Sequence, residues 1–426
     1  MWSEVENPVT EPKGLAERIF REESGRILAT LIRISGSFDL AEEAMQDAFA
    51  SALANWKSRG VPKNPGAWIT AVAHRKLIDS VRRQNTRIEK QDTLQKELER
   101  RERKDEPTAE DMSTSYPDDR LRLIFSCCHP ALNREAQVGL TLRTLGGLTT
   151  GEIARAFLVP EATLAQRLVR AKQKIRDANI PYEVPPIQVL PERLESVQAV
   201  LYLIFNEGYM ATTSEELVRG DLCAEAIRLA RTLCELLPME PENLGLLSLM
   251  LLHDSRRNAR VNSAGDLVPL EEQDRSRWNG EQIREGTALV EQALRLRRAG
   301  PYQLQAAIAA LHAQANASQE TDWRQIAALY SEMRRLSPTP VIALNHAVAV
   351  AMSEGLKQGL AMFDTLSAGG ELEDYYLFHA ARADILRRMG RNRDARTSYE
   401  RALTLVTNPV ERRYLTRRLS EVSGSR

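Results

Sequence analysis

Apolar residues recur along nearly the whole chain at spacings of three and four, which is the spacing that lines one face of an α-helix. Runs of β-branched residues are short, and no Asn-Gly turn stands between stretches that alternate apolar and polar residues. The pattern therefore gives no sign of β-hairpins. The sequence predicts an all-α protein.

Two interruptions of this pattern divide the chain. Residues 89–118 carry many charges and few large apolar side chains, so we expect a charged linker or a solvated helix there. Residues 183–191 include Pro185, Pro186 and Pro191, and such dense proline favours an extended connector. We therefore predict three helical domains, at residues 1–88, 119–182 and 192–426.

The first predicted domain contains an acidic helix followed by a basic one. The apolar face of residues 39–56 consists of Ala41, Met45, Ala48, Phe49, Ala52 and Trp56. The opposite face carries Asp39, Glu42, Glu43, Gln46 and Asp47. A second helix over 65–83 has a mostly basic stripe of Arg75, Lys76, Asp79, Arg82 and Arg83, with His74 nearby. This pair suits a body that contacts a protein on one side and phosphates on the other, although a solvated acidic face is the simpler interpretation of the first helix.

The second predicted domain has the pattern of a helix-turn-helix. Thr149 and Glu152 form a capping box, and Pro160 suits the first position of a second helix over 161–178. The buried side of that helix is predicted to hold Leu164, Leu168, Ala171 and Ile175. Its open side holds Thr163, Gln166, Arg167, Arg170 and Lys174. Arginine and glutamine can bond base edges in the major groove, whereas a structural hairpin with a solvated basic face is the alternative.

Both domains resemble parts of bacterial sigma factors. Leu40-Ala41-Glu42-Glu43-Ala44-Met45-Gln46-Asp47-Ala48-Phe49 resembles a stretch of sigma region 2, and residues 65–83 are similar to the helix that follows it. Residues 151–157 and 163–171 resemble region 4. Regions 2 and 4 without region 3 are typical of extracytoplasmic-function (ECF) sigma factors. The departures are Ala48, where a threonine is usual, and Val159-Pro160, where a serine-type cap is common.

The resemblance implies a DNA-binding transcription initiation factor without a catalytic residue or a cofactor. Its partners would be promoter DNA and core RNA polymerase, through the β′ clamp and the β flap. The acidic residues at positions 39–47 would dock on the clamp. Trp68 and the basic stripe of helix 65–83 would open and hold the minus-10 element, and helix 161–178 would bind the minus-35 element.

The third predicted domain follows the spacing of tetratricopeptide repeats (TPR). Ala383, Gly390, Ala395, Tyr399 and Ala402 stand at the expected positions, and a weaker copy contains Ala347, Gly355 and Phe363. We predict a TPR-like α-solenoid that regulates the sigma core in cis and offers a surface to a protein or peptide. A sigma core with such an extension resembles one ECF subgroup.

The composition narrows the possible location of the protein and its chemistry, but it does not indicate a function. The formal net charge is +0, and four cysteines are too few for a disulfide framework, so we expect a cytoplasmic protein. The acidic N-terminus and the lack of a long apolar run argue against export and against a membrane span. Cys127 and Cys128 lack the spacing of a metal site, so no metal is predicted.

Two alternative functions remain open. A helix-turn-helix regulator that acts without polymerase would be expected to dimerise on a palindromic site, and it leaves the acidic helix unexplained. An enzyme could use His253 together with the carboxylates at 254 and 271–274. A salt-bridge cluster in a loop is the simpler interpretation of those residues.

Overall fold

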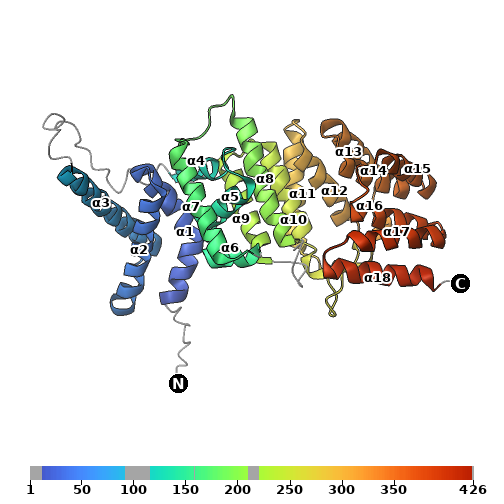
Figure 1. Ribbon diagram of the computed structural model, residues 1–426, viewed down its shortest axis with the longest axis horizontal. Coiled ribbons are helices and arrows are strands. Elements are labelled where there is room, and N and C mark those ends of the chain that lie inside the picture. Colours follow the sequence, from blue (N-terminus) through green and yellow to red (C-terminus); the bar gives the residue numbers. More distant parts are fainter. Residues whose placement is uncertain (1–11, 92–115, 158, 210–219, 425–426) are drawn as a thin grey trace, which may run out of the picture. The chain divides into compact units, whose positions relative to one another are not determined.

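The computed structural model describes residues 12–91, 116–157, 159–209 and 220–424 (Figure 1). The elements of these residues are helices, and the one β-type pairing is an isolated bridge between Val261 and Leu267. The predicted all-α class is confirmed. The chain forms two compact units, Met1–Val200 and Leu201–Arg426. Helix α8 (Leu190–Tyr209) begins in the first unit and ends in the second.

Three helices build the first part of unit 1: α1 (Pro12–Ser35), α2 (Phe38–Arg59) and α3 (Pro65–Gln91). Ser37 caps α2, because its Oγ accepts a hydrogen bond from the Leu40 amide at 3.4 Å. The whole predicted apolar face of α2, from Ala41 to Trp56, is buried. Ile69, Ala73 and Leu77 of α3 are fully covered as well. The amphipathic pattern therefore located this core correctly.

The second part of unit 1 contains α4 (Tyr116–Cys127), α5 (Arg134–Thr144), α6 (Thr150–Ala156) and α7 (Glu161–Asp177). Buried Asp119 joins it to the first part, because it accepts a hydrogen bond from Arg33 Nε at 3.0 Å. The Tyr182 hydroxyl donates to the Ala29 carbonyl at 2.8 Å. Most of the predicted charged linker, residues 92–115, lies outside the described residues.

The proline-rich connector is held against unit 1. Pro185 is buried, and α8 begins at Leu190, so the last two residues of the predicted connector are helical. Arg193 donates to the Phe125 carbonyl at 2.7 Å, and the Ser196 hydroxyl donates to the Cys128 carbonyl at 3.2 Å. The first turns of α8 therefore pack against the second part of unit 1.

Unit 2 is a succession of helices after α8. They are α9 (Gly220–Leu236), α10 (Pro241–Asp254), α11 (Gly280–Arg295), α12 (Pro301–Gln314), α13 (Trp323–Leu336), α14 (Pro340–Ser353), α15 (Leu356–Gly369), α16 (Tyr376–Arg388), α17 (Asn392–Leu405) and α18 (Pro409–Ser423). Helix α10 is buried on nearly all sides, so it forms the centre of the first half.

The later helices pack as close pairs through small residues. Ala383, Ala395 and Ala402 of α16 and α17 are fully buried, and Tyr399 is buried among them. In the preceding pair, a Cβ added at Gly359 would lie 2.7 Å from the Cα of Ala351, so α15 and α14 meet nearly backbone to backbone. The close pairing expected from the repeat spacing is therefore present. Its classification as TPR-like stays a prediction.

The segment between α10 and α11 crosses to the C-terminal helices of unit 2. We call residues 261–278 the strap; they include the short 3-10 helices η2 (Leu270–Glu272) and η3 (Arg275–Arg277). Glu271 pairs with Arg388, Glu272 pairs with Arg418, and Asp266 pairs with Arg413. The strap is therefore tied by charge to α16 and α18.

Candidate nucleic-acid interface

Helix α7 presents the predicted DNA-contacting side chains to solvent. Leu164, Leu168, Ala171 and Ile175 are buried, as the pattern requires. All five members of the predicted open face are exposed: Thr163, Gln166, Arg167, Arg170 and Lys174. Such a face can donate several hydrogen bonds to bases and phosphates at once. The arrangement is chemically able to bind duplex DNA.

A capping box fixes the first residue of α6, the helix before α7. The Thr149 amide donates to Glu152 Oε2 at 2.7 Å, and the Glu152 amide donates to Thr149 Oγ1 at 3.2 Å, so the predicted capping box is confirmed. Pro160 is the N-cap of α7 rather than its first residue, and it supplies no side-chain cap. This one-residue difference follows from its backbone, since ψ of 138° lies outside the helical region.

Helix α3 carries the second predicted DNA-contacting set. Arg75 and Arg82 are exposed, whereas Lys76 is half-buried and the side chain of Arg83 lies outside the described residues. Half-buried Trp68 packs against buried Trp56, with the ring centroids 5.8 Å apart. Burial, together with the Arg33 charge, lowers the pKa of His74.

The structure divides the acidic set predicted on α2. Glu43, Gln46 and Asp47 are exposed and available to a partner. Asp39 and Glu42 instead contact α7: Lys172 Nζ lies 2.9 Å from Asp39 Oδ1 and 3.0 Å from Glu42 Oε2. Arg176 Nη1 lies 3.4 Å from Asp39 Oδ2. We call these four residues the α2–α7 clasp.

The ion pairs of the clasp shift the pKa values of Asp39 and Lys172. The hydrogen bond from Lys172 lowers the pKa of Asp39. Burial opposes the charge of Lys172, but its bonds to Asp39 and Glu42 raise its pKa overall. Lys172 was not among the residues predicted from the sequence. Its place beside buried Ala171, at the edge of the apolar stripe, was the one signal that it would face another helix.

Cys127 at the end of α4 and Cys128 directly after it are both buried. Cys127 Sγ is 3.2 Å from Thr144 Oγ1, and Cys128 Sγ is 3.6 Å from Thr141 Oγ1. Burial raises the pKa of both thiols, that of Cys128 to about 11. Across the described residues, no group of three or more His, Cys, Asp or Glu side chains could hold a metal ion.

The polar residues considered for an enzymatic site have separate partners. Asp254 bonds Arg257 Nε at 2.8 Å and Gln282 Nε2 at 2.8 Å, and Glu271 pairs with Arg388. Burial lowers the pKa of His253 well below the usual value for histidine. Asp254 and Glu271 are thus held by cationic or amide partners, and the partner of Glu271 lies outside the loop.

Comparison with known proteins agrees with this geometry. The chain matches the models of Sigma-70 region 2 over residues 19–87 and of Sigma-70, region 4 over residues 122–175. Residues 193–294 match a family of unknown function (DUF6596). No solved structure matches the chain. An uncharacterised protein of Rhizobium meliloti (strain 1021) is 44% identical over 403 residues, which cover 93% of each chain.

These matches define the class of the protein. The chain belongs to the sigma-70 family of transcription initiation factors, and the Rhizobium relative matches it over 93% of both chains. Its role is in promoter-directed transcription, with core RNA polymerase and promoter DNA as partners. None of the described helices is both long and apolar enough to cross a membrane.

Proposed function

We propose that the protein is an ECF-type sigma factor in which α3 contacts the minus-10 element and α7 contacts the minus-35 element. The observation that carries this proposal is the exposed polar and cationic face of α7, which follows a capped helix in the order of a helix-turn-helix. Exposed Arg75 and Arg82 on α3 support the assignment of the other element. The exposed acids Glu43 and Asp47 of α2 are the proposed contacts with the β′ clamp.

Run-off transcription with purified core polymerase tests this proposal. Genomic fragments transcribed with and without the protein should give products that depend on it, and their start sites should share two sequence elements. The same fragments should give weaker products with Arg167→Ala. Sequence-specific binding as a dimer, with no effect of core polymerase, would favour the regulator that acts alone.

We further infer that residues 192–426 regulate the sigma core in cis. They make up more than half of the chain and follow the helix-turn-helix directly after the short proline-rich connector. A domain tethered by a short connector acts at an effective concentration of order millimolar, so a weak contact is enough to alter activity. The helix pairs of unit 2 are also the proposed surface for a protein or peptide partner.

Truncation after Val200 tests the control in cis. The cut falls there because Arg193 and Ser196 bond α4 and the residue that follows it, so removing them would disturb the core. Run-off transcription by the truncated protein should differ several-fold from that of the full chain. Cooperative thermal unfolding serves as the folding control. Equal activity at matched concentration, with both proteins folded, would remove the regulatory role.

A further inference from the structure

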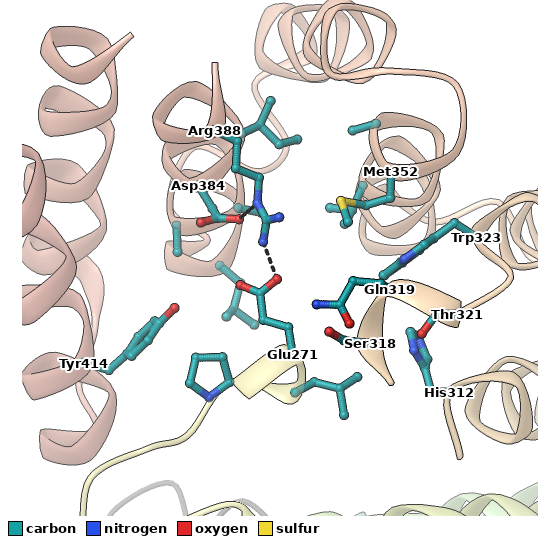
Figure 2. Close-up of a pocket in the computed structure, with 18 of the residues that line it drawn as sticks. Glu271, His312, Ser318, Gln319, Thr321, Trp323, Met352, Asp384, Arg388 and Tyr414 are labelled. Carbon is teal, nitrogen blue, oxygen red and sulfur yellow. Dashed lines mark hydrogen bonds and ion pairs between the residues drawn. The ribbon is translucent and has the colours of Figure 1, made fainter. Parts of the chain in front are cut away.

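A cavity of about 630 Å³ lies within unit 2, between the strap and the C-terminal helices (Figure 2). Its walls come from the strap, from the residues around η4 (Ser318–Glu320), and from α14, α16 and α18. This volume falls in the range of small-molecule sites, of about 300–1,000 Å³. Neither the sigma fold nor the proposed DNA contacts use this cavity.

The wall formed by α14 and α16 is mostly apolar. Val348 and Met352 of α14 face the cavity, as do Leu377 and Ile385 of α16. Figure 2 shows Met352 and Trp323 on the side opposite Tyr414. Such walls favour the apolar body of a ligand over water, by roughly 25 cal/mol for each Å² removed from solvent.

The guanidinium of Arg388 stands at a charged end of the cavity. Arg388 Nε donates to Asp384 Oδ2 at 2.6 Å, and Arg388 Nη2 donates to Glu271 Oε2 at 2.6 Å (Figure 2). Asp384 also accepts from Arg387 Nε at 3.1 Å. A guanidinium has five N–H groups, so the two bonds leave donors of Arg388 for a further acceptor. The Arg388 and Glu271 side chains are 27% and 39% exposed, so solvent reaches their pair.

We propose that this cavity binds a small molecule with an apolar body and a carboxylate, which replaces Glu271 on Arg388. Exchange of one carboxylate for another preserves the charge balance around the guanidinium. A planar guanidinium also matches two carboxylate oxygens at once, which gives the site its selectivity. The primary amide of the same acid carries no charge, so it forms a weaker bond with Arg388.

The wall made by the strap remains in place during this exchange. Glu272 still pairs with Arg418, and Arg275 Nη1 still donates to the Ala315 carbonyl at 2.8 Å. Glu271 therefore swings away from an otherwise anchored segment. This inference concerns unit 2 alone and does not rest on promoter recognition or on control in cis.

Isothermal titration of the full-length protein with two acids and their amides tests the site. The probes are octanoate and 3-phenylpropionate, each compared with the corresponding primary amide. Saturable binding of at least one acid is expected below about 5 mM, with its amide bound about tenfold more weakly or not at all. No saturable binding by either acid up to that concentration, or equal affinity for acid and amide, overturns the proposal.

Three variants separate this site from unspecific uptake. Arg388→Gln should weaken acid binding about tenfold, because a charge-assisted bond is lost. Glu271→Gln should tighten it several-fold, because the internal competitor no longer carries charge. Arg396→Gln breaks an exposed pair with Glu400 on α17 and should bind the acids as wild type does. Unchanged affinity in both Arg388→Gln and Glu271→Gln, with folding confirmed by thermal unfolding, would also overturn the proposal.

Discussion

Removal of Lys172 tests whether the α2–α7 clasp competes with polymerase for the acidic face of α2. In Lys172→Ala, Asp39 and Glu42 lose the cation that lies within 3.0 Å of each. Lys172→Ala leaves the Asp39–Arg176 pair, at 3.4 Å, so most of the cost of opening the clasp is removed. If Asp39 and Glu42 contact the β′ clamp together with Glu43 and Asp47, this release makes them available. We therefore expect tighter binding to core polymerase.

The size of the expected gain in polymerase affinity follows from how exposed the paired charges are. Exposed ion pairs contribute about 0.2–1 kcal/mol, and partly buried pairs contribute more. The Asp39 side chain is 55% exposed, so its pair lies in the lower range, whereas the Lys172 and Glu42 side chains are 15% and 16% exposed. Together the two pairs stabilise the clasp by about 1–2 kcal/mol, after allowance for screening. Because 1.4 kcal/mol is a factor of ten, the expected gain in affinity is about fivefold to thirtyfold.

Equilibrium binding of labelled protein to core polymerase at low and moderate salt measures this gain. The matched control is Lys174→Ala, which removes an exposed lysine of the same helix two residues away. Lys174→Ala should leave polymerase binding unchanged, and the advantage of Lys172→Ala should shrink as salt weakens the clasp in wild type. Polymerase affinity of Lys172→Ala equal to or below that of wild type, in a folded protein, would refute the reasoning.

Three further predictions concern separate parts of the chain. Glu43→Arg and Asp47→Ala should each weaken pull-down of β′ while changing the free energy of unfolding by less than about 0.5 kcal/mol, since both residues are exposed; intact pull-down by both would contradict the docking face. Arg167→Ala should weaken DNA binding by about 1–3 kcal/mol and relax the preference at one position in a binding-site selection. Lys174→Ala should weaken binding to all DNA sequences alike. An unchanged selected motif in Arg167→Ala would remove Arg167 from the contact face. Gly359→Ala should lower the free energy of unfolding by about 1–2 kcal/mol in urea titrations, because the added methyl meets the backbone of Ala351, while Gly369→Ala, with open space around it, should be close to neutral.

The pH dependence of the clasp follows from the directions in which the pKa values of Asp39 and Lys172 are shifted. Asp39 has a lowered pKa, so its contribution is present above the usual range of an aspartate and is lost as the pH falls through the lowered value. Lys172 has a raised pKa, so its contribution is complete below the usual range of a lysine and is lost only at higher pH. Asp39 and Lys172 are therefore both charged near neutral pH, where polymerase binding is to be measured.

Local patterns in the sequence were sufficient for the helices and their buried faces. The apolar stripes of α2 and α7 were predicted residue by residue, because the helical period fixes which side chains share a face. The capping box at Thr149 was predictable for the same reason, since both partners lie within one turn. The close pairing of α16 with α17 followed from small residues at fixed spacings.

Contacts between distant parts of the sequence could not be predicted in this way. Lys172 and Glu42 are 130 residues apart, and no periodicity connects them. The acids of the strap were expected to pair within their own loop, yet Glu271 reaches Arg388, which lies 117 residues further along. The partner of a charged side chain depends on how helices pack, and that information is spread over the whole core.

Helix α7 carries two sets of charges, one exposed to solvent and one in the clasp with α2. Helix α7 carries Gln166 and Arg167 on its exposed face, and Lys172 of the clasp lies at the edge of its buried stripe. If the clasp must open before α2 docks on polymerase, docking frees α7 from α2 at the same moment. By linkage, the effect of polymerase on DNA affinity equals the effect of DNA on polymerase affinity. If promoter DNA binds α7 more tightly when the clasp is open, promoter DNA therefore also strengthens polymerase binding, by the same factor. The coupling between the two events is thus limited to about the 1–2 kcal/mol that the clasp supplies.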